Sequence, residues 1–303
     1  MPSTRAGGRN VHFYLFSEPD KPLGGMILNP SVSKKNFLSM LDILIVATGP
    51  YRVTLRSTRE DLVPTDDALQ PGQYDLRPYS RTDTISINDE HCIIRTLSRT
   101  KTGRNDFFRD RVRDRDKKCV ITGTCNRRPD IDGWTGFETA HICPVSHEEY
   151  FVRNGFSRWI TNRTGPGDTG INSVQNGLLM LAHIHELFDS FDISINPDDG
   201  FKITCFMGDS FGVDGRILDR VCQEDSGEEG ARDELLRWHF RQAVLTNMRR
   251  DGEPSFEMDF PPGSDMMGEI LSGPKPAERM EAELFLRLHG IGVPYEARPD
   301  EPS

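Results

Sequence analysis

Three stretches decide how the middle of this chain folds: CVITG (residues 119–123), ETAHICP (residues 138–144) and INSVQNGLLMLAHIHELFDSFDISINPDDGFKI (residues 171–203). His141 stands near the end of a short apolar segment, and Asn176 stands in a second one. His185 and Asp189 follow, four residues apart. The functional interpretation of this chain depends on the order of these four residues.

The segment around His141 has strand character. Residues 137–143 are followed by Pro144, so we expect His141 at the rim of a strand. A neutral imidazole there can take a proton from water as the water attacks phosphorus. A histidine at such a place is also commonly a packed or hydrogen-bonded structural residue. Taken alone, His141 leaves both interpretations open.

The other three residues lie in and just before a predicted helix over 178–188. Asn176 precedes this helix, where an amide either bridges a loop backbone to hold a neighbouring imidazole or serves as a turn or cap residue. The spacing of four puts His185 and Asp189 on one helix face. An imidazole and a carboxylate together suit Mg²⁺, Mn²⁺ or Zn²⁺. Each residue also has an ordinary structural role, so the joint order carries the interpretation.

Four segments together resemble the HNH endonuclease family: Cys119-Val-Ile-Thr-Gly123, Ala140-His-Ile-Cys-Pro144, Asn176-Gly-Leu-Leu179 and Ile184-His-Glu-Leu-Phe-Asp189. The resemblance is to a branch with AHIxP, NGLL and IHxLFD motifs, as in fungal proteins that contain an HNH nuclease domain. It covers about 90 of the 303 residues. It implies an α+β fold with a ββα-metal (His-Me finger) unit, in which one helix crosses a β-hairpin and a single divalent ion lies between them.

The same resemblance implies roles for individual residues. His141 takes the place of the general base, Asn176 that of the residue that orients it, and His185 and Asp189 those of the metal ligands. The implied cofactor is a divalent cation, with Mg²⁺ expected before Mn²⁺ or Zn²⁺. The implied partner is nucleic acid, with DNA expected before RNA, and the implied activity is hydrolysis of phosphodiester bonds.

One position departs from the family pattern. Many family members carry a metal-binding Asp or His directly before the general base, and this chain has Ala140 there. Glu138 shares the strand face of Ala140, and we expect it to reach the ion only if the strand bends locally. Either two protein side chains, water and phosphate hold the ion, or the chain has kept the scaffold and changed its activity.

Two other interpretations of these residues are open. The run from His185 to Asp189 is similar to a zinc-protease helix with Asp in place of the second His and Glu186 as the base. This short motif is weak, and it would make His141 and Asn176 coincidental. A scaffold used for binding or for a non-nuclease reaction is favoured by Ala140 and by the acidic net charge. Replacing Glu186 by Gln separates the protease from the nuclease.

The charge pattern limits how the chain can bind nucleic acid. A formal net charge of -10 argues against coating nucleic acid by bulk electrostatics. Residues 101–118 are an exception, because eight basic and four acidic side chains give this segment a local charge of +4. We predict a helix over 104–118. Its charges either pair with one another along the helix or contact phosphate.

Cysteine usage and hydropathy point to an intracellular protein. The six cysteines form no C-x-x-C pair, which favours free thiols in a reducing compartment. Cys119 and Cys125 flank a turn, but no second pair has the spacing of a structural zinc site. No apolar run approaches the ~20 residues that span a bilayer. The N-terminal MPSTRAGGRN lacks the apolar segment of a secretory signal.

We predict four units along the chain. They are a disordered segment (1–10), a small α+β unit (11–100), an HNH domain (104–208) and a helical C-terminal region (209–303). The strands predicted in the α+β unit cover 11–16, 25–28, 51–56, 72–76 and 92–95, with a helix over 33–45. The helices predicted in the C-terminal region cover 231–250 and 276–288.

Overall fold

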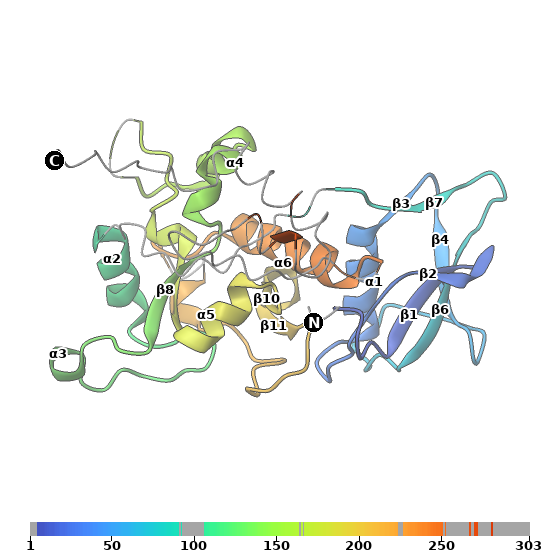
Figure 1. Cartoon of the computed structure of the whole chain (residues 1–303), viewed down its shortest axis with the longest axis horizontal. Coiled ribbons are helices and arrows are strands. Elements are labelled where there is room, and N and C mark those ends of the chain that lie inside the picture. The colour runs from blue at the N-terminus through green and yellow to red at the C-terminus, as the bar shows by residue number, and fades with distance from the viewer. Residues whose placement is uncertain are drawn as a thin grey trace.

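The structure is a computed structural model that describes residues 5–90, 92, 106–163, 165, 167–223, 227–250, 252, 267, 270, 271 and 280. Its strands and helices are mixed in the order of an α+β protein, as the sequence predicts. In Figure 1 an N-terminal sheet lies at one end of the molecule, strand β8 and helix α2 lie toward the other, and helix α6 runs between them. Within the described parts of the chain, no helix is both long and apolar enough to cross a membrane.

The N-terminal part (residues 5–90) is built on one five-stranded sheet in the order β2-β1-β6-β4-β5. Its strands are β1 (Val11–Leu15), β2 (Glu18–Met26), β4 (Tyr51–Leu55), β5 (Glu60–Asp61) and β6 (Gly72–Pro78). β1 and β6 run parallel, and the other neighbours run antiparallel. A separate antiparallel pair joins β3 (Ile45–Ala47) to β7 (Ile85–Ile87).

Helix α1 (Lys34–Leu44) packs on this sheet. Ser33 begins it with a capping box: the Ser33 hydroxyl accepts from the Asn36 N–H, and the Asn36 side chain accepts from the Ser33 N–H. Phe37 is fully buried, and its ring lies 6.4 and 5.2 Å from aromatic rings of β1 and β6. The helix predicted over 33–45 is therefore confirmed. Its cap and its apolar face could both be predicted from the sequence.

Most strands predicted for the N-terminal part are present. Those predicted at 11–16, 51–56 and 72–76 correspond to β1, β4 and β6. The strand predicted at 25–28 is instead β2, which begins seven residues earlier. Its first five residues are exposed and polar or Pro, so they carry no apolar alternation. The strand predicted at 92–95 and the helix predicted at 276–288 fall outside the described residues, apart from positions 92 and 280.

The N-terminal segment is held more firmly than its composition suggested. Disorder was predicted for residues 1–10, and this is wrong for 5–10. Arg5 is only 6% exposed; its Nη1 lies 2.7 Å from an Asp192 carboxylate oxygen and 2.6 Å from Asn247 Oδ1. Its partners lie far along the chain, so no local sequence pattern predicts this contact.

The middle part (residues 106–223) contains short elements joined by long loops. Its helices are α2 (Asp106–Asp116), α3 (Pro129–Asp132), α4 (Glu148–Arg153) and α5 (Ala182–Asp189). Its strands are β8 (Phe137–His141), β9 (Gly177–Leu181), β10 (Ile193–Asn196) and β11 (Lys202–Cys205). Its 3₁₀ turns are η1 (Val145–His147), η2 (Phe156–Trp159), η3 (Val174–Asn176), η4 (Pro197–Asp199) and η5 (Arg220–Cys222).

β8 and β9 form a regular antiparallel pair, with His141 opposite Gly177. The helix predicted over 178–188 is therefore wrong at its start: residues 177–181 are strand, and α5 begins at Ala182. The first four residues of β9 are all buried. A strand covered on both faces is apolar at consecutive positions and loses the alternation that distinguishes it from a helix.

The β8–β9 hairpin lies between two helices. Ala140 and Met180 belong to the core that also contains the buried face of α5, whereas Leu179 belongs to the core that contains the buried face of α2. Side chains alternate between the two faces of a strand. Glu138 therefore shares the α5 face with Ala140, and His141 lies on the α2 face.

Helix α6 (Asp233–Met248) joins the two parts. Leu235 and Leu236 in its first half belong to the core of the middle part. Val244 and Met248 in its second half belong to the core of the N-terminal part. The helix predicted over 231–250 is confirmed. The predicted unit boundaries at 100, 104 and 208 stay predictions.

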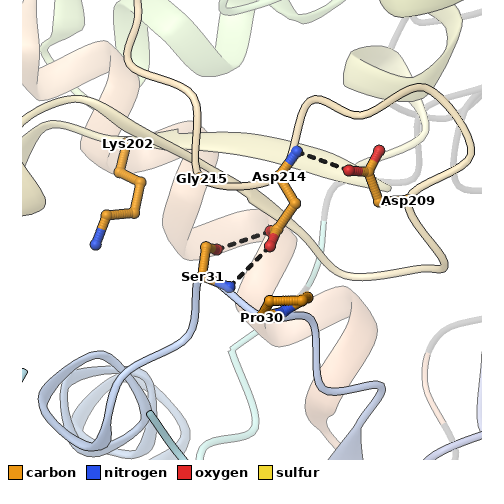
Figure 2. A pocket seen from close by; sticks show the side chains of 6 residues that line it. All are labelled: Pro30, Ser31, Lys202, Asp209, Asp214 and Gly215. Carbon is orange, nitrogen blue, oxygen red and sulfur yellow. Dashed lines mark hydrogen bonds between the residues drawn. The ribbon is translucent and has the colours of Figure 1, made fainter. Parts of the chain in front are cut away.

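A polar junction also connects the two parts, as Figure 2 shows. The Asp214 carboxylate accepts from the Ser31 N–H at 2.9 Å and from the Ser31 hydroxyl at 2.8 Å. Asn29 donates to the carbonyls of Cys205 and Met207. Beside these bonds lies an open hollow, into which Lys202 also projects (Figure 2).

Candidate functional site

His141 is the last residue of β8. Its ring stacks on Phe108 of α2, with centroids 3.9 Å apart and planes 12° apart. Its Nε2 lies 3.2 Å from the side-chain oxygen of Asn172, in the loop before η3. The imidazole is therefore held in its plane by an aromatic ring and at one edge by an amide.

Gly177 makes room for that stack. It lies opposite His141 in the hairpin, and a Cβ added to it would come 2.6 Å from Phe108 Cε2 and 2.6 Å from Val112 Cγ2. Any larger side chain would push Phe108 and Val112 out of place. The glycine in the NGLL sequence is thus explained by the close approach of α2 to β9.

Asn176 is fully buried directly beneath the loop that follows His141. Its Oδ1 accepts from the Cys143 N–H at 2.8 Å, and its Nδ2 donates to the Cys143 carbonyl at 2.9 Å and to the Ile171 carbonyl at 2.8 Å. One carboxamide therefore ties the segment that carries His141 to the loop that carries Asn172.

His185 lies between two carboxylates. Its Nδ1 is 2.7 Å from a Glu138 oxygen, and its Nε2 is 3.1 Å from Asp189 Oδ2, one helical turn further along α5. Burial acts to lower the pKa of His185, but the carboxylates of Asp189 and Glu138 outweigh burial and raise the pKa from 6.5 to about 9. Without a cation in place of the proton, this imidazole is charged at neutral pH.

The pair formed by His185 and Asp189 fits a divalent cation. Two ligand atoms at right angles on an ion with bonds of about 2.1 Å are about 3 Å apart, and the Nε2–Oδ2 distance is 3.1 Å. Glu138 accepts from the other ring nitrogen, as second carboxylates commonly do at metal-bound histidines. Among the described residues, no group of three or more His, Cys, Asp or Glu side chains is arranged to hold a metal ion. Water and substrate would therefore supply the remaining ligands.

Glu138 contacts His185 without any distortion of its strand. The sequence predicts that Glu138 reaches the ion itself only if the strand bends locally, and this stays a prediction. β8 keeps a regular register with β9 throughout, and Glu138 still reaches His185, because both lie on the α5 side of the hairpin. Ala140, on the same face, is fully buried in the core. The small side chain directly before His141 is thus a packing residue.

The structure brings some predicted site residues together and leaves one apart. His185 and Asp189 are in contact, and Asn176 anchors the loop after His141. His141 itself lies on the opposite face of the hairpin from His185, against Phe108. The expected meeting of His141 with the metal ligands around one ion stays a prediction.

The basic helix α2 is largely paired. Arg109 bonds Asp106 at 2.6 Å and Asp110 at 3.1 Å, and Arg113 lies 3.9 Å from Asp110. Arg111 pairs with Glu229. Two roles were open for the charges predicted on this helix, ion pairing and contact with phosphate. The bonds seen here support ion pairing.

Two neighbouring residues at the end of α2 support the site, and the sequence did not single them out. The buried Asp116 accepts from the Leu179 N–H at 2.8 Å, and Arg115 donates to the Gly177 carbonyl at 2.6 Å and the Val174 carbonyl at 2.9 Å. Burial raises the pKa of Asp116 against the opposing effect of Arg115. In the sequence this pair is indistinguishable from the surface charges before it.

Two further histidines, His147 and His183, lie in the same part of the chain as the candidate site. His147 is 5% exposed, with Nδ1 3.0 Å from the Ser146 hydroxyl. His183 is exposed on α5, and its ring lies 4.6 Å from that of Phe211. Burial of His147 agrees with a structural role, and the exposed His183 provides a matched control for His185.

Comparison with known families agrees with this geometry. Residues 119–196 match the family model described as HNH endonuclease, so this segment is a domain of the HNH endonuclease family. Residues 8–83 match a second family, described as a domain of unknown function (DUF8573). The chain matches no curated protein and no solved structure. Phe108, Arg115 and Asp116 lie outside the HNH match, although they contact residues inside it.

Proposed function

We propose that this protein is a metal-dependent endonuclease that hydrolyses phosphodiester bonds of nucleic acid, with DNA as the preferred substrate. The observation that carries the proposal is the contact of His185 with Asp189 and Glu138 inside the segment that matches the HNH family. Hairpin β8–β9 and helix α5 are the elements that a ββα-metal unit requires, in the required order.

In this proposal each residue has a separate task. His141 takes the proton from the attacking water, and Asn176 holds the loop that follows it. His185 Nε2 and Asp189 hold the divalent cation, while Glu138 accepts a hydrogen bond from His185 Nδ1. The cation, when bound, supplies positive charge against the developing charge on phosphate and on the leaving oxygen.

The proposal places a demand on the substrate. Glu138 and His141 are three residues apart on β8, which is about 10 Å at the rise of a strand. They also lie on opposite faces of the hairpin. A phosphodiester served by both His141 and the cation must lie at the end of the β8–β9 pair where His141 lies opposite Gly177 and β8 leaves the sheet.

A second candidate is an HNH-like scaffold used for binding or for a non-nuclease reaction. The observation that favours it is the position of the His141 ring, packed on Phe108 and turned to the α2 side. A scaffold would keep the fold and the anchoring by Asn176 without bringing His141 to a cation.

Nicking of supercoiled plasmid separates the two candidates. We expect the full chain to nick DNA in Mg²⁺ or Mn²⁺ and to stop in chelator, with RNA cut more slowly. His141→Ala should lower the rate 10²–10⁴-fold, about the contribution of a general base. His185→Ala should also abolish cleavage, whereas the matched control His183→Ala should not. If DNA and RNA stay intact with Mg²⁺, Mn²⁺ and Zn²⁺, the nuclease proposal is wrong and the HNH-like scaffold is the better candidate.

Thermal unfolding tests the cation site without turnover. A cation at 100 times its dissociation constant stabilises the folded protein by about 2.7 kcal/mol, which raises the Tm by roughly 4–5 °C for a protein of this size. The shift should be present in the wild type and in His183→Ala and absent in His185→Ala. Equal shifts in all three would place the bound cation elsewhere.

A further inference from the structure

We propose that the N-terminal part binds single-stranded nucleic acid on the face of its sheet that is turned away from α1. Two arginines on this face hold a phosphate, and two aromatic rings stack on unpaired bases. The four residues form what we call the arginine–aromatic face: Arg52, Arg77, Phe16 and Tyr79. The choice of nucleic acid as the ligand rests on the proposed nuclease function, because the same chain contains the HNH domain.

Strands β1, β4 and β6 have one buried and one exposed face. They contribute residues to the core that also contains the buried side of α1, namely Phe13, Val53 and Leu76. Because side chains alternate along a strand, the arginine–aromatic face lies on the opposite side of the sheet. Phe16 is 52% exposed and Tyr79 is 68% exposed. Solvent therefore reaches both rings on the side away from α1.

The four side chains lie close together at one end of these strands. Arg52 is directly opposite Arg77 in the β4–β6 pair. The guanidinium carbon of Arg77 lies 4.5 Å from the centre of the Phe16 ring. The Tyr79 N–H donates to the Pro50 carbonyl at 3.1 Å, so strand pairing continues past the end of β6. Tyr79 therefore keeps to the face of Arg77, about 7 Å further along the chain.

The two arginines are poorly neutralised by the protein itself. Arg56, on the same face, has its Nε 3.0 and 3.1 Å from the two carboxylate oxygens of Asp75. Arg52 lies 3.8 Å from Asp61, and within the described residues Arg77 forms no ion pair. Like charges directly opposite each other on neighbouring strands are destabilising. A phosphate bound between Arg52 and Arg77 would remove this repulsion, and guanidinium groups match phosphate in geometry.

The exposed rings distinguish nucleic acid from other anions. Bases stack on aromatic side chains at sites that bind single strands, and arginines beside the rings hold the backbone. A single strand presents phosphates and bases in alternation, which matches two arginines with a ring on either side. In a duplex the bases are already stacked on one another, so the rings of Phe16 and Tyr79 would lose their partners. An acidic peptide would supply the charge without the bases.

The position of this surface gives it a separate role from the candidate nuclease site. The N-terminal sheet lies at one end of the molecule, and β8 lies toward the other (Figure 1). The arginine–aromatic face would therefore hold a stretch of the strand outside the point of cleavage. Its binding can be measured without turnover.

The test is fluorescence anisotropy of the full chain with a labelled oligothymidine of about 20 nucleotides, long enough for a typical single-strand site. Chelator is present throughout, so that the oligonucleotide is not cut. The variants are Arg77→Gln, Phe16→Ala and Tyr79→Ala. Lys35→Gln is the matched control, because Lys35 is an exposed cation on α1, on the other side of the sheet. Thermal unfolding checks that each variant folds.

The arginine and the rings should affect binding in different ways. Arg77→Gln should lower the slope of log K against log salt concentration by about 0.7, the value for one phosphate contact on a single strand. Phe16→Ala and Tyr79→Ala should each weaken binding by about 5-fold or more and leave that slope unchanged. Lys35→Gln should bind as the wild type does. The wild type should bind a duplex, or a strand without bases, more weakly than oligothymidine.

Three results would overturn the proposal: unchanged binding in all three folded variants, equal binding of strands with and without bases, and competition by oligoglutamate as strong as by oligothymidine. The outcome for the nuclease is separate. Binding that depends on Phe16 and Arg77 in a protein that cuts neither DNA nor RNA refutes the proposed nuclease and leaves the binding surface intact. Cleavage by the wild type together with unchanged binding in the three variants has the opposite meaning.

Discussion

Replacing Gly177 by Ala tests the packing on which the position of His141 depends. The new Cβ would lie 2.6 Å from Phe108 Cε2 and 2.7 Å from Phe108 Cζ. Ordinary carbon contacts are about 3.5–4.0 Å, so α2 or the Phe108 ring must move by roughly 1 Å. The backbone itself accepts Ala, because Gly177 has φ -132° and ψ 151°.

Two opposing effects set the size of the result. Overpacking a buried site costs about 1–3 kcal/mol. Ala restricts the unfolded chain more than Gly does, and this raises the stability of the folded protein by about 0.4–1 kcal/mol. The overpacking is larger, so Gly177→Ala should lose roughly 1–2 kcal/mol of stability and lower the Tm by about 2–3 °C.

The assay is thermal unfolding with three comparison proteins. Gly208→Ala is the matched control: a Cβ there meets nothing within 4 Å, so its stability should change by less than about 0.5 kcal/mol. Phe108→Leu should cost less in the Gly177→Ala background than in the wild type, because the flexible Leu can yield to the new methyl. A Tm of Gly177→Ala at or above that of the wild type refutes the steric reasoning.

Three further predictions concern other parts of the molecule. Arg5→Ala should lower stability by about 2–4 kcal/mol in urea unfolding, since it leaves buried partners such as Asn247 Oδ1 without this donor; an unchanged midpoint would mean that the N-terminal segment is not held. Burial acts to raise the pKa of Asp209, but backbone N–H donors outweigh burial and lower the pKa. The stability that the ionised carboxylate contributes is therefore present above pH 4 and is lost as pH falls through the lower pKa of the folded state. Asp209→Asn should therefore be less stable than wild type at pH 7, by about 1 kcal/mol, and equal to it near pH 2. Glu186→Gln should leave nuclease activity intact, because Glu186 is exposed while His185 bonds other carboxylates; loss of a proteolytic activity in this variant would support the protease interpretation instead.

Local sequence signals predicted the local structure well. The capping residue and the apolar spacing of α1 located that helix within one residue, and the broad apolar face of residues 231–250 located α6. The spacing between His185 and Asp189 predicted a contact that the structure has at 3.1 Å. In each case the determining groups lie within a single helix and its cap.

Where the sequence misled, the determining contacts were distant. Residues 177–181 look helical because both faces are buried, and that burial comes from α2 on one side and α5 on the other. Asn172 is 31 residues from His141, and Arg5 is 187 residues from Asp192. A spacing rule cannot identify such pairs, because their separation along the chain is set by loops that carry no period.

The site therefore depends on more of the chain than the segment that matches the HNH family. Phe108 and Asp116, which precede residue 119, contact the imidazole of His141 and the backbone of β9. His239 of α6, which follows residue 196, donates through Nε2 to the carbonyl of Phe188, the residue before Asp189, and its Nδ1 bonds the Ser194 hydroxyl. Helices on both sides of the matched segment thus fix the two ends of the candidate site. α6 also packs into the N-terminal core, so a change in the N-terminal part has a direct physical route to the end of α5 that carries Asp189.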